Sequence, residues 1–392
     1  MISVEEALAH VLALAGPVRM EEVALRAAAG RVLAAPAVAR LTQPPFDASA
    51  MDGYALATAD HAPGARLRVV GESRAGLGFA GTLLRGEAVR IFTGAPVPEG
   101  AGVVVLQEDV TREGDWLLLP PQLALGSNIR GRGQDFALGD TLAAPLRLQP
   151  QHLALLAAMN VPELHVARRP EVAIIATGDE LVMPGDTPGP GQIICSNSFA
   201  LAAMAEAAGA VARLLPIARD NAASLRQVFD LAAGADLIVT SGGASVGDHD
   251  LVATVAAELG LQRSFWKIAM RPGKPLMAGR MGNAAMLGLP GNPVSAIVCA
   301  HLFMRPLLDA MQGLPGVVTP QQAVLQSDLA PNGPRRHFMR AKLLPGTPPR
   351  IVAFAGQDSA LLRLMSEADA LLIRPEGDGA RQAGETVPYL AI

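Results

Sequence analysis

The sequence predicts a multidomain α/β protein built around a doubly wound, mostly parallel sheet. From Pro170 onward, apolar strand-like runs alternate with helical segments. The run VAIIA at 172–176 is continuously apolar, as expected of a strand that is buried on both faces of a parallel sheet. Residues 46–145 and 316–392 instead contain short β-type runs interrupted by Gly and Pro. Alternation of strand and helix favours an open sheet with helices on both faces, and β-rich regions flank it here.

These changes of pattern divide the 392 residues into four domains. An N-terminal helical and extended domain comprises residues 1–45 and 146–168, because a helical pattern returns after the β-rich region. Residues 46–145 form an all-β domain that is inserted into it. Residues 169–315 form the α/β domain, and residues 316–392 form a small, barrel-like C-terminal β domain.

The first segment is typical of an amphipathic helix and not of a signal peptide. Ser3 and Glu6 have the spacing of a capping box, and apolar residues within 4–15 recur at helical spacing. Acidic residues stand where a signal peptide would carry basic ones. Another helix is expected at 148–160.

The α/β domain should supply both the main core and the ligand site. We predict strands at 172–176, 211–217, 237–240, 265–269, 276–278 and 285–289. We predict helices at 198–208, 222–233, 251–259 and 294–311. Ligands of a doubly wound sheet bind at the carboxyl ends of the strands, so the functional residues are sought in the loops that follow them.

The composition excludes several classes of function. The net charge is −4 and aromatic residues make up 4% of the chain, which argues against nucleic-acid binding by charge or by base stacking. No apolar run approaches the length of a membrane span. The two cysteines, Cys195 and Cys299, do not make a disulfide framework and suit a reducing compartment. We therefore expect a cytoplasmic protein that binds neither nucleic acid nor membrane.

Two glycine-containing loops follow predicted strands. ATGDEL at 176–181 either directs carboxylates and backbone amides at a ligand or is a plain acidic turn. TSGGASVGDHD at 240–250 matches neither the dinucleotide nor the P-loop fingerprint. Its Gly and Ser residues suit an anion cradle, whereas Asp248 or Asp250 either caps the next helix or serves a Mg²⁺ ion beside a phosphate. Spacing alone leaves these alternatives open.

Two further strand ends carry features expected of an anion site. Lys267, Arg271 and Lys274 lie in a segment that prolines stiffen, which favours a shaped cationic pocket for an oxyanion. In GLPGNPVS at 288–295, Asn292 as N-cap and the proline after it specify a helix start, and free amides there favour anions. The alternative is an ordinary capped helix.

Histidine and cysteine give no pattern for zinc or for a nucleophile. The seven histidines are scattered, without HxH or HExxH, and there is no GxSxG motif. His249 stands between two aspartates, which favours hard oxygen ligands over zinc. In the inserted domain, the stretches 45–54, 91–100 and 128–135 pair turn glycines with acids, hydroxyls or Arg, and each alone is typical of a structural turn.

Seven motifs occur along the chain in a recognisable order: FDASAMDGYA, RIFTGAPVPEG, NIRGRGQDF, ATGDEL, TSGGASVGDHD, FWKIAMRPGKP and GLPGNPVSA. Their spelling and order resemble those of the molybdopterin molybdenumtransferase family, also called the MoeA family, whose fold forms the E-domain of gephyrin. The resemblance extends over essentially the whole chain, including the C-terminal β domain. It implies an α/β domain of the molybdopterin-binding type.

The resemblance implies an enzyme of molybdenum cofactor biosynthesis. Members of the family take molybdate and adenylylated molybdopterin, cleave the adenylate with Mg²⁺ or a similar cation, release AMP and place molybdenum on the dithiolene. They are elongated homodimers in which the N-terminal β region of one subunit faces the α/β domain of the other. A transient contact with the molybdopterin adenylyltransferase is also implied.

The resemblance also implies roles for individual residues. Catalytic roles fall on Asp52, Thr93, Asp135, Glu180, Asp250, Lys267 and Lys274. Substrate-binding roles fall on Gly242, Gly243, Ser245, Arg271, Pro290, Pro293, Arg340 and Ser359. The implied metal ligands are Asp220, Asp250 and Glu180. We expect Gly242, Gly243 and Ser245 to bind the pterin phosphate. We expect three basic residues, Lys267, Arg271 and Lys274, here called the basic trio, to attract molybdate. Asp248 and His249 have no assigned task, so their substitution should be tolerated.

Two positions depart from the family pattern. Arg271 stands where many members have Lys, which keeps the charge but replaces a point charge with a planar fork. QDSA at 357–360 replaces a commoner GSG-like turn, and Asp358 adds a negative charge there. Both departures lie in the part of the site that is expected to receive the oxyanion.

Two other functions fit part of the sequence. A molybdopterin adenylyltransferase of the same pathway would share the α/β domain, but its loop is usually written TGGTG and it needs neither the N-terminal β region nor the C-terminal domain. A non-enzymatic scaffold, as in gephyrin, would need a partner groove. The acids of the expected pocket are all retained, which favours an enzyme.

Overall fold

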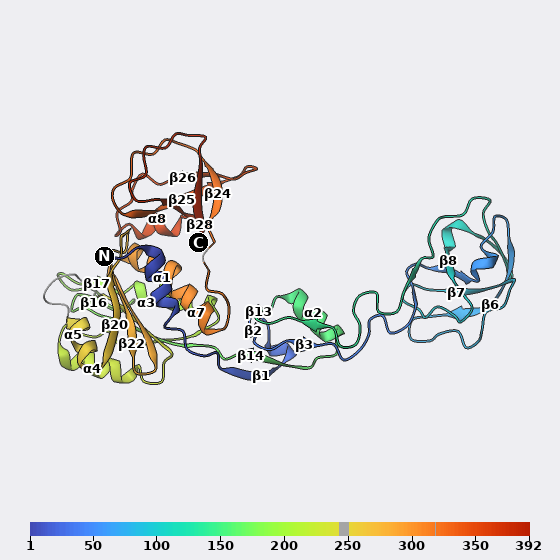
Figure 1. Ribbon diagram of the computed structural model, residues 1–392, viewed down its shortest axis with the longest axis horizontal. Coiled ribbons are helices and arrows are strands. Elements are labelled where there is room, and N and C mark those ends of the chain that lie inside the picture. The colour runs from blue at the N-terminus through green and yellow to red at the C-terminus, as the bar shows by residue number, and fades with distance from the viewer. Residues whose placement is uncertain (243–250, 318) are drawn as a thin grey trace.

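The chain forms an elongated molecule with its α/β domain near one end and its inserted β domain at the other (Figure 1). The computed structural model describes residues 1–242, 251–317 and 319–392. The C-terminal β domain lies on the α/β domain, and a small domain containing α2 (Pro150–Ala158) lies midway along the molecule (Figure 1).

The central sheet confirms the predicted fold class. Its strand order is β18-β15-β19-β23-β22-β20. The strands are β18 (Val211–Leu214), β15 (Glu171–Ala176), β19 (Leu237–Ser241), β23 (Ala284–Leu289), β22 (Pro275–Met281) and β20 (Leu261–Lys267). β15 is parallel to β18 and β19, and β19 is parallel to β23, whereas β22 and β20 are antiparallel. The carboxyl ends of β15, β19 and β23 therefore meet at one edge.

Helices cover both faces of this sheet because successive strand residues point to opposite sides. In β15, Val172 and Ile174 pack in one core cluster, and Ala173 and Ile175 pack in the other. The first cluster lies under α1 (Val4–Leu12), α3 (Asn197–Ala207), α6 (Pro293–Cys299) and α7 (Arg305–Met311). The second lies under α4 (Ala222–Leu231) and α5 (Leu251–Glu258).

The N-terminal helix forms as predicted but packs elsewhere than expected. The Glu6 amide donates to the Ser3 hydroxyl at 3.1 Å and the Ser3 amide donates to the Glu6 carboxylate at 2.8 Å, which completes the capping box. Val4, Ala7 and Val11 are buried in the core of the α/β domain. α1 therefore belongs to that domain and not to the unit formed with residues 146–168, because its apolar stripe is covered there.

The last helical segment of the α/β domain is a core element. It runs through α6, a π-helical turn at Ala300–Met304 and α7. The expectation that no apolar run approaches the length of a membrane span is wrong for Pro293–Met311, which is long and apolar enough by length and composition. However, 67% of its apolar 18-residue stretch is buried inside the protein. Its apolar character is therefore explained by packing against the sheet.

The N-terminal half contains two main β-sheets, and only the one in the inserted domain was predicted as β-rich; the residues on either side of it were expected to be helical and extended. A four-stranded sheet of order β1-β14-β2-β13 combines β1 (Met20–Ala24), β14 (Glu163–Ala167), β2 (Val32–Leu33) and β13 (Leu146–Arg147). The inserted domain has a six-stranded sheet of order β8-β5-β7-β6-β10-β9. Its strands are β8 (Val103–Leu106), β5 (Gly53–Leu56), β7 (Glu87–Ile91), β6 (Arg66–Ser73), β10 (Trp116–Leu118) and β9 (Thr111–Glu113). Short ladders join β4 (Ala48–Ser49) to β11 (Ile129–Arg130) and β3 (Ala37–Val38) to β12 (Thr141–Leu142).

The C-terminal domain is a small barrel. Its strand order is β21-β25-β26-β24-β28-β27, and a further pairing of β25 with β27 closes the sheet. The strands are β21 (Met270–Arg271), β25 (Arg336–Leu344), β26 (Arg350–Ala353), β24 (Gln321–Leu325), β28 (Thr386–Ala391) and β27 (Ala370–Arg374), with helix α8 (Leu362–Ser366) between β26 and β27. β21 comes from the α/β domain, so the segment that carries Arg271 is shared by both domains.

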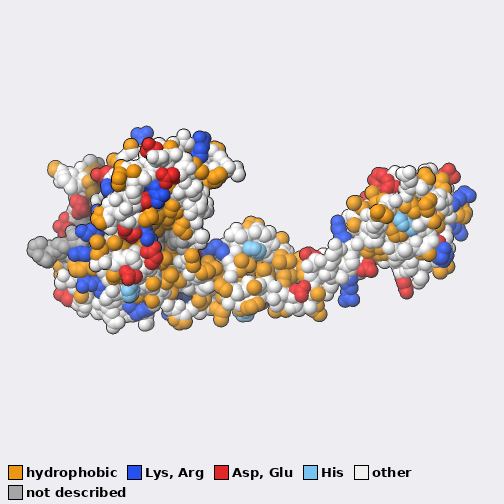
Figure 2. All heavy atoms as spheres, turned by 45° about the horizontal axis from the view of Figure 1, so that its top comes forward, with side chains coloured by type: hydrophobic (Ala, Val, Ile, Leu, Met, Phe, Trp, Pro, Cys, Tyr) orange, Lys and Arg blue, Asp and Glu red, His pale blue; other side chains and the backbone are white. Residues whose placement is uncertain are grey.

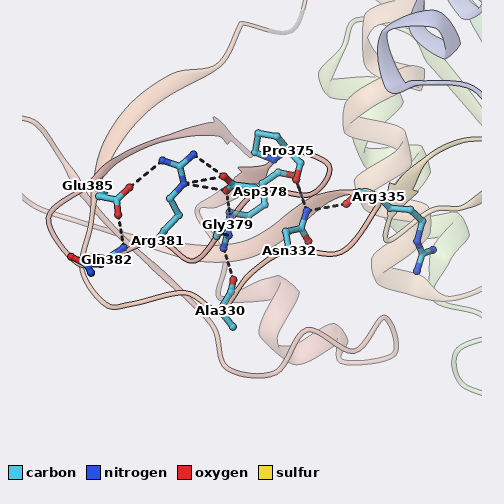
Figure 3. A network of polar contacts seen from close by, with 10 residues as sticks. Ala330, Asn332, Arg335, Pro375, Asp378, Gly379, Arg381, Gln382 and Glu385 are labelled. Atoms are coloured by element: carbon cyan, nitrogen blue, oxygen red, sulfur yellow. Dashed lines mark hydrogen bonds and ion pairs between the residues drawn. The ribbon is translucent and has the colours of Figure 1, made fainter.

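A buried ionic network fixes one end of this barrel (Figure 3). Asp378 accepts hydrogen bonds from Arg374 at 2.5 Å and from Arg381 at 2.7 Å, and its side chain is 8% exposed. The Arg374 side chain is only 2% exposed. Asn332 donates to the carbonyls of Arg335 and Pro375 at 3.0 and 2.6 Å. The hydrogen bonds from the two arginines, Arg381 first, hold the pKa of Asp378 below its ordinary value.

Replacing Asp378 with Asn should destabilise the protein by about 3–5 kcal/mol, because Arg374 would be left buried without a counter-charge. Denaturant unfolding of the full chain measures this loss. Since the folded-state pKa of Asp378 is lowered, its contribution is complete above pH about 4 and is lost as the pH falls through the folded-state pKa. The difference between wild type and Asp378→Asn should therefore shrink in acid.

The control is Glu367→Gln, which removes a solvent-exposed ion pair with Arg363 in the same barrel. Glu367→Gln should lower the free energy of unfolding by about 0.5 kcal/mol or less. An equal loss from both variants would show that burial of the Asp378 network does not matter.

Candidate functional site

A large pocket opens at the carboxyl ends of β15, β19 and β23. Its volume is about 1140 Å³. Residues from several loops line it: Ala176, Thr177, Gly178, Glu180, Leu181, Ile193, Ile194, Cys195, Ser196, Asn197, Asp220, Ser241, Gly242, Leu251, Val252, Thr254, Pro275, Pro290, Gly291, Asn292, Pro293 and Ala360. The predicted site residues Glu180, Asp220, Gly242, Pro290 and Pro293 are thus brought together.

The floor of this pocket is made of backbone. The Thr177 amide donates to the Ser241 carbonyl at 3.0 Å, and the Gly242 amide donates to the Leu289 carbonyl at 3.2 Å. Gly242 has φ +99°, and a Cβ atom there would lie 2.5 Å from the Thr177 carbonyl oxygen. Only glycine fits this contact. Backbone can therefore approach a ligand without an intervening side chain.

One wall of the pocket is acidic. The Asp220 amide donates to the Asp179 carboxylate at 3.1 Å, and the Asp179 amide is 3.4 Å from the Asp220 carboxylate. Arg219 donates to the carbonyls of Gly178, Asp179 and Leu181 at 3.3, 3.2 and 3.0 Å. These bonds fix the ATGDEL loop beside Asp220, so that Glu180 and Asp220 face the same cavity although 40 residues separate them along the chain.

Asn197 is a pocket residue that sequence reasoning missed. Its side-chain amide donates to the Ser241 hydroxyl at 2.9 Å and to the Gly291 carbonyl at 2.7 Å. It is the first residue of α3 and follows the strand β17 (Ile193–Ile194) after two intervening residues. The sequence around it, CSNS, matches no motif that carries a mechanism, so it gave no signal.

The C-terminal domain closes one side of the pocket. Asn292 is the N-cap of α6, but its side chain makes no capping bond and donates instead to the Ser359 hydroxyl at 2.9 Å. The Val294 amide donates to the Ser359 carbonyl at 3.1 Å. This amide at the helix start, predicted to be free for an anion, is therefore already used to dock the C-terminal domain.

Arg340, which is buried in the barrel, binds the loop that carries Ser359. Its side chain is 1% exposed, and it donates to the carbonyls of Gly356 at 3.2 Å and Asp358 at 2.8 Å. Burial lowers the pKa of Arg340, the nearby Asp358 raises it and Arg271 lowers it further. Arg340 thus supports the loop of Ser359, and substrate contact by its guanidinium stays a prediction. Burial, reinforced by the neighbouring arginines, also lowers the pKa of His337 to about 4, so this histidine is neutral at pH 7.

The basic trio lies on the segment between β20 and β22. Lys267, Arg271 and Lys274 are all exposed, and Lys267 is paired with Pro275, which lines the pocket. The N-terminus anchors this segment: the Ile2 amide donates to the Lys267 carbonyl at 3.1 Å. The trio is therefore accessible, and in sequence it lies directly before Pro275, a residue of the pocket. None of the three residues lines the pocket itself.

Asp52 and Thr93 form a second constellation at the far end of the molecule. Asp52 accepts hydrogen bonds from the Thr93 amide at 2.8 Å and the Thr93 hydroxyl at 2.7 Å. These bonds, the backbone one first, hold the pKa of Asp52 below its ordinary value. Arg90 donates to the Gly53 carbonyl at 2.8 Å and stacks over Phe92, which ties together the segments carrying this pair.

This constellation is separated from the pocket of its own chain. The inserted domain and the α/β domain occupy opposite ends of the molecule (Figure 1). The Asp135 amide donates to the Gln43 carbonyl at 3.1 Å, in the connection between the inserted domain and the N-terminal domain. One chain thus brings the acids of the α/β domain together but leaves Asp52, Thr93 and Asp135 apart from them.

Family comparisons cover nearly the whole chain. Residues 2–160 match the MoeA N-terminal region, domains I and II. Residues 173–310 match the probable molybdopterin binding domain, and residues 322–392 match the MoeA C-terminal region, domain IV. Among curated relatives, a molybdopterin molybdenumtransferase from a Nostoc species is 36% identical over 386 residues, which cover 95% of this chain and 88% of the relative.

The chain belongs to the MoeA family of molybdopterin molybdenumtransferases. A molybdopterin molybdenumtransferase from Haemophilus influenzae is 38% identical over 317 residues, which cover 80% of this chain and 78% of the relative. The crystal structure of a MoeA protein from Pyrococcus horikoshii superposes with a TM-score of 0.81 at 32% identity, covering 100% of this chain and 99% of the other. The MoeA chain is accordingly a transferase of molybdenum cofactor biosynthesis that acts on molybdopterin.

Several predicted site residues of the MoeA chain lie outside the described residues. These are Gly243, Ser245 and Asp250, together with Asp248 and His249. Among the residues that are described, no three His, Cys, Asp or Glu side chains form a group that could hold a metal. The predicted metal set contains Asp250, so a cation at Glu180 and Asp220 stays a prediction.

Replacing Gly242 with Ala should impair the MoeA reaction, because the added Cβ must displace the Thr177 carbonyl and so distort the pocket floor. We expect kcat/KM for molybdenum transfer to fall about tenfold or more, in line with the loss of binding geometry at a close backbone contact. Steady-state kinetics with molybdopterin substrate measures this.

The matched control is Gly234→Ala. Gly234 also has a positive φ, +83°, but its Cβ would enter open space. Both variants carry backbone strain of about 1 kcal/mol, whereas only Gly242→Ala should lose activity. Equal kinetic effects would contradict the role of the floor contact.

Proposed function

We propose that this chain transfers molybdenum from molybdate to adenylylated molybdopterin, with release of AMP that depends on a divalent cation. The observation that carries the proposal is the 1140 Å³ pocket, in which an acidic wall meets a floor of exposed backbone. Ligand pockets for small molecules occupy about 300–1,000 Å³, so this one has room for a two-part substrate. Full-length similarity to curated molybdenumtransferases favours this function over an adenylyltransferase.

The floor and the acidic wall suit the two ends of a pyrophosphate. Gly242 and Gly291 present backbone without side chains, and a Cβ on Gly291 would already lie 3.5 Å from the Gly242 Cα. Such concave backbone favours phosphate oxygens. Glu180 and Asp220 line the same pocket, where unneutralised carboxylates would repel a phosphate. A phosphate can therefore bind between them only together with a cation.

The donor set fits Mg²⁺, which takes oxygen ligands and usually retains several waters. Glu180 and Asp220 would hold it, with Asp250 as the third carboxylate. When bound, Mg²⁺ supplies neutralisation of the phosphate charge that develops as the adenylate leaves. The chain's own acids then serve to place the cation, and the glycine floor holds the pterin phosphate in line.

Lys267, Arg271 and Lys274 would attract molybdate to the pocket. They are exposed, and a doubly charged oxyanion gains most from several cations on a stiff segment. The segment is held by Ile2 on one side and by β25 on the other. In Arg271 the planar fork can engage two oxygens of one anion. Ser359 would lie at the edge of this route, beside Asn292.

We further propose a homodimer in which Asp52, Thr93 and Asp135 of one subunit complete the pocket of the other. The elongated shape supports this, because the two sets of residues are too far apart within one chain (Figure 1). Apolar side chains are also plentiful on the surface of the arm that joins the two ends (Figure 2). Val38, Leu41 and Phe46 are 49, 41 and 40% exposed. Exposed apolar patches of this kind mark protein contacts.

The cellular setting of the proposed reaction is the cytoplasm, where a transient contact with the adenylyltransferase would deliver the substrate. Cys195 and Cys299 are both free and buried, as suits a reducing compartment. Burial raises the pKa of Cys299, which makes it unreactive. A scaffold function finds no specific support, since the pocket retains its acids.

Incubation of the purified protein with adenylylated molybdopterin, molybdate and Mg²⁺ should release AMP, and omission of molybdate or removal of the metal should stop it. Asp220→Asn should lower the rate about a hundredfold, because the cation would lose a charged ligand. Chromatography of AMP over time measures both effects.

The control is Glu206→Gln, an exposed acid on α3 of the same domain. It should behave as wild type. Release of AMP at the same rate without molybdate, or full activity of Asp220→Asn, would contradict the proposal.

The shared site should be visible by complementation. Asp52→Asn and Asp220→Asn should each be nearly inactive as homodimers, but their co-expression should restore about a quarter of wild-type activity. Half of the dimers are then mixed, and each mixed dimer of a two-fold assembly contains one intact site. If each chain acted alone, the mixture would remain inactive.

A further inference from the structure

Asn197 connects the floor of the pocket to its acidic wall. Its side-chain amide donates to the Ser241 hydroxyl at 2.9 Å and to the Gly291 carbonyl at 2.7 Å. Ser241 ends β19, and Gly291 belongs to the turn that follows β23. Among the described residues, the last backbone bond between these two strand ends runs from the Gly242 amide to the Leu289 carbonyl. The Asn197 side chain adds a bond to Gly291, two residues beyond Leu289.

The segment that carries Asn197 also contacts the loop of Glu180. The Ile193 amide donates to the Glu180 carbonyl at 2.8 Å, and the Cys195 amide donates to the Val182 carbonyl at 2.8 Å. These bonds pair β17 with β16 (Leu181–Val182) in parallel. Residues 193–197 therefore form a segment, here called the 193–197 bar, that connects the Glu180 loop to the glycine floor. Asn197 makes the hydrogen bonds between this segment and the floor.

The chemistry of the attachment requires an amide. Gly291 offers a carbonyl oxygen, which only accepts hydrogen bonds, so the side chain that meets it must donate. An amide nitrogen has two hydrogens and can supply both contacts. A carboxylate of the same shape would place an acceptor against the carbonyl and add a charge beside the acids of the wall.

We infer that Asn197 is a positioning residue for the transfer reaction, which holds the glycine floor and the Glu180 wall at the spacing that the substrate needs. The inference rests on the proposed function, since it is the adenylylated substrate that spans the two sides. Asn197 acts through Ser241, Gly291 and the 193–197 bar, and its loss should weaken substrate binding more than it slows turnover.

The test compares Asn197→Ala with Asn197→Asp in the full-length enzyme. Loss of the two hydrogen bonds should raise KM for adenylylated molybdopterin about tenfold in Asn197→Ala. Asn197→Asp should raise it about a hundredfold, because repulsion from the Gly291 carbonyl is added. In both variants kcat should change less than KM. Calorimetric titration with AMP, the expected product, should show a weakened Kd in the same order.

The order of the two variants separates positioning from space filling. If Asn197 only filled volume, the Asp variant would match wild type and the Ala variant would be worse, which would overturn the inference. Unchanged KM and AMP affinity in both variants would also overturn it. An inactive wild type would overturn the proposed function itself, whereas an active wild type with unaffected variants would overturn only this inference.

Asn332 provides a matched control for stability. Like Asn197, it donates from its amide to backbone carbonyls, those of Arg335, Arg374 and Pro375, but it does so in the barrel (Figure 3). Asn332→Ala and Asn332→Asp should lower Tm without altering KM. A rise in KM as large as that of the Asn197 variants would mean that general destabilisation explains both, and the inference would fall.

Discussion

The candidate site depends on the parallel hydrogen bonding of β15, β19 and β23. Parallel neighbours end at the same edge of a sheet, so the loops after them are forced together whatever their separation in sequence. The amide of Thr177 continues this pairing to Ser241, and the amide of Gly242 continues it to Leu289. The first residue of the loop after β15 and that of the loop after β19 are therefore each held by a backbone hydrogen bond to the neighbouring strand, and these bonds make the pocket floor rigid.

The C-terminal barrel is coupled to this edge through polar contacts. Ser359 meets Asn292 and Val294 at the start of α6, and Arg340 holds the same loop through its carbonyls. A buried guanidinium is stable only when its donors are satisfied, and Arg340 satisfies them on the carbonyls of this loop and so holds it in place within the barrel. The barrel thus forms part of the pocket wall, and β21 carries the basic segment into its sheet.

The elongated shape separates two chemically different constellations. The acids of the α/β domain share a pocket, whereas Asp52 lies in the inserted domain, where hydrogen bonds from Thr93 lower its pKa. Arg90 fixes both segments of that pair by bonding to the Gly53 carbonyl and stacking on Phe92. In the proposed homodimer, a second subunit would bring the two constellations together.

The sequence by itself located the main strands and helices of the α/β domain and identified the family. Apolar periodicity located the strands and helices of the α/β domain, and Ser3 and Glu6 specified the first cap, because these signals depend on neighbouring residues alone. The motifs also named Glu180, Asp220 and Gly242, which the fold brings into one pocket. Local pattern sufficed for these residues since they follow recognisable strand ends.

Only the tertiary structure decided where α1 packs, what the start of α6 binds and that Asn197 lines the site. The apolar stripe of α1 can cover any apolar surface, and the sequence does not say which one is available. The Val294 amide looks free until Ser359, 65 residues later, is seen to accept its hydrogen bond. Asn197 acquires its partners only when three distant loops converge. These contacts are long-range, and no local pattern encodes them.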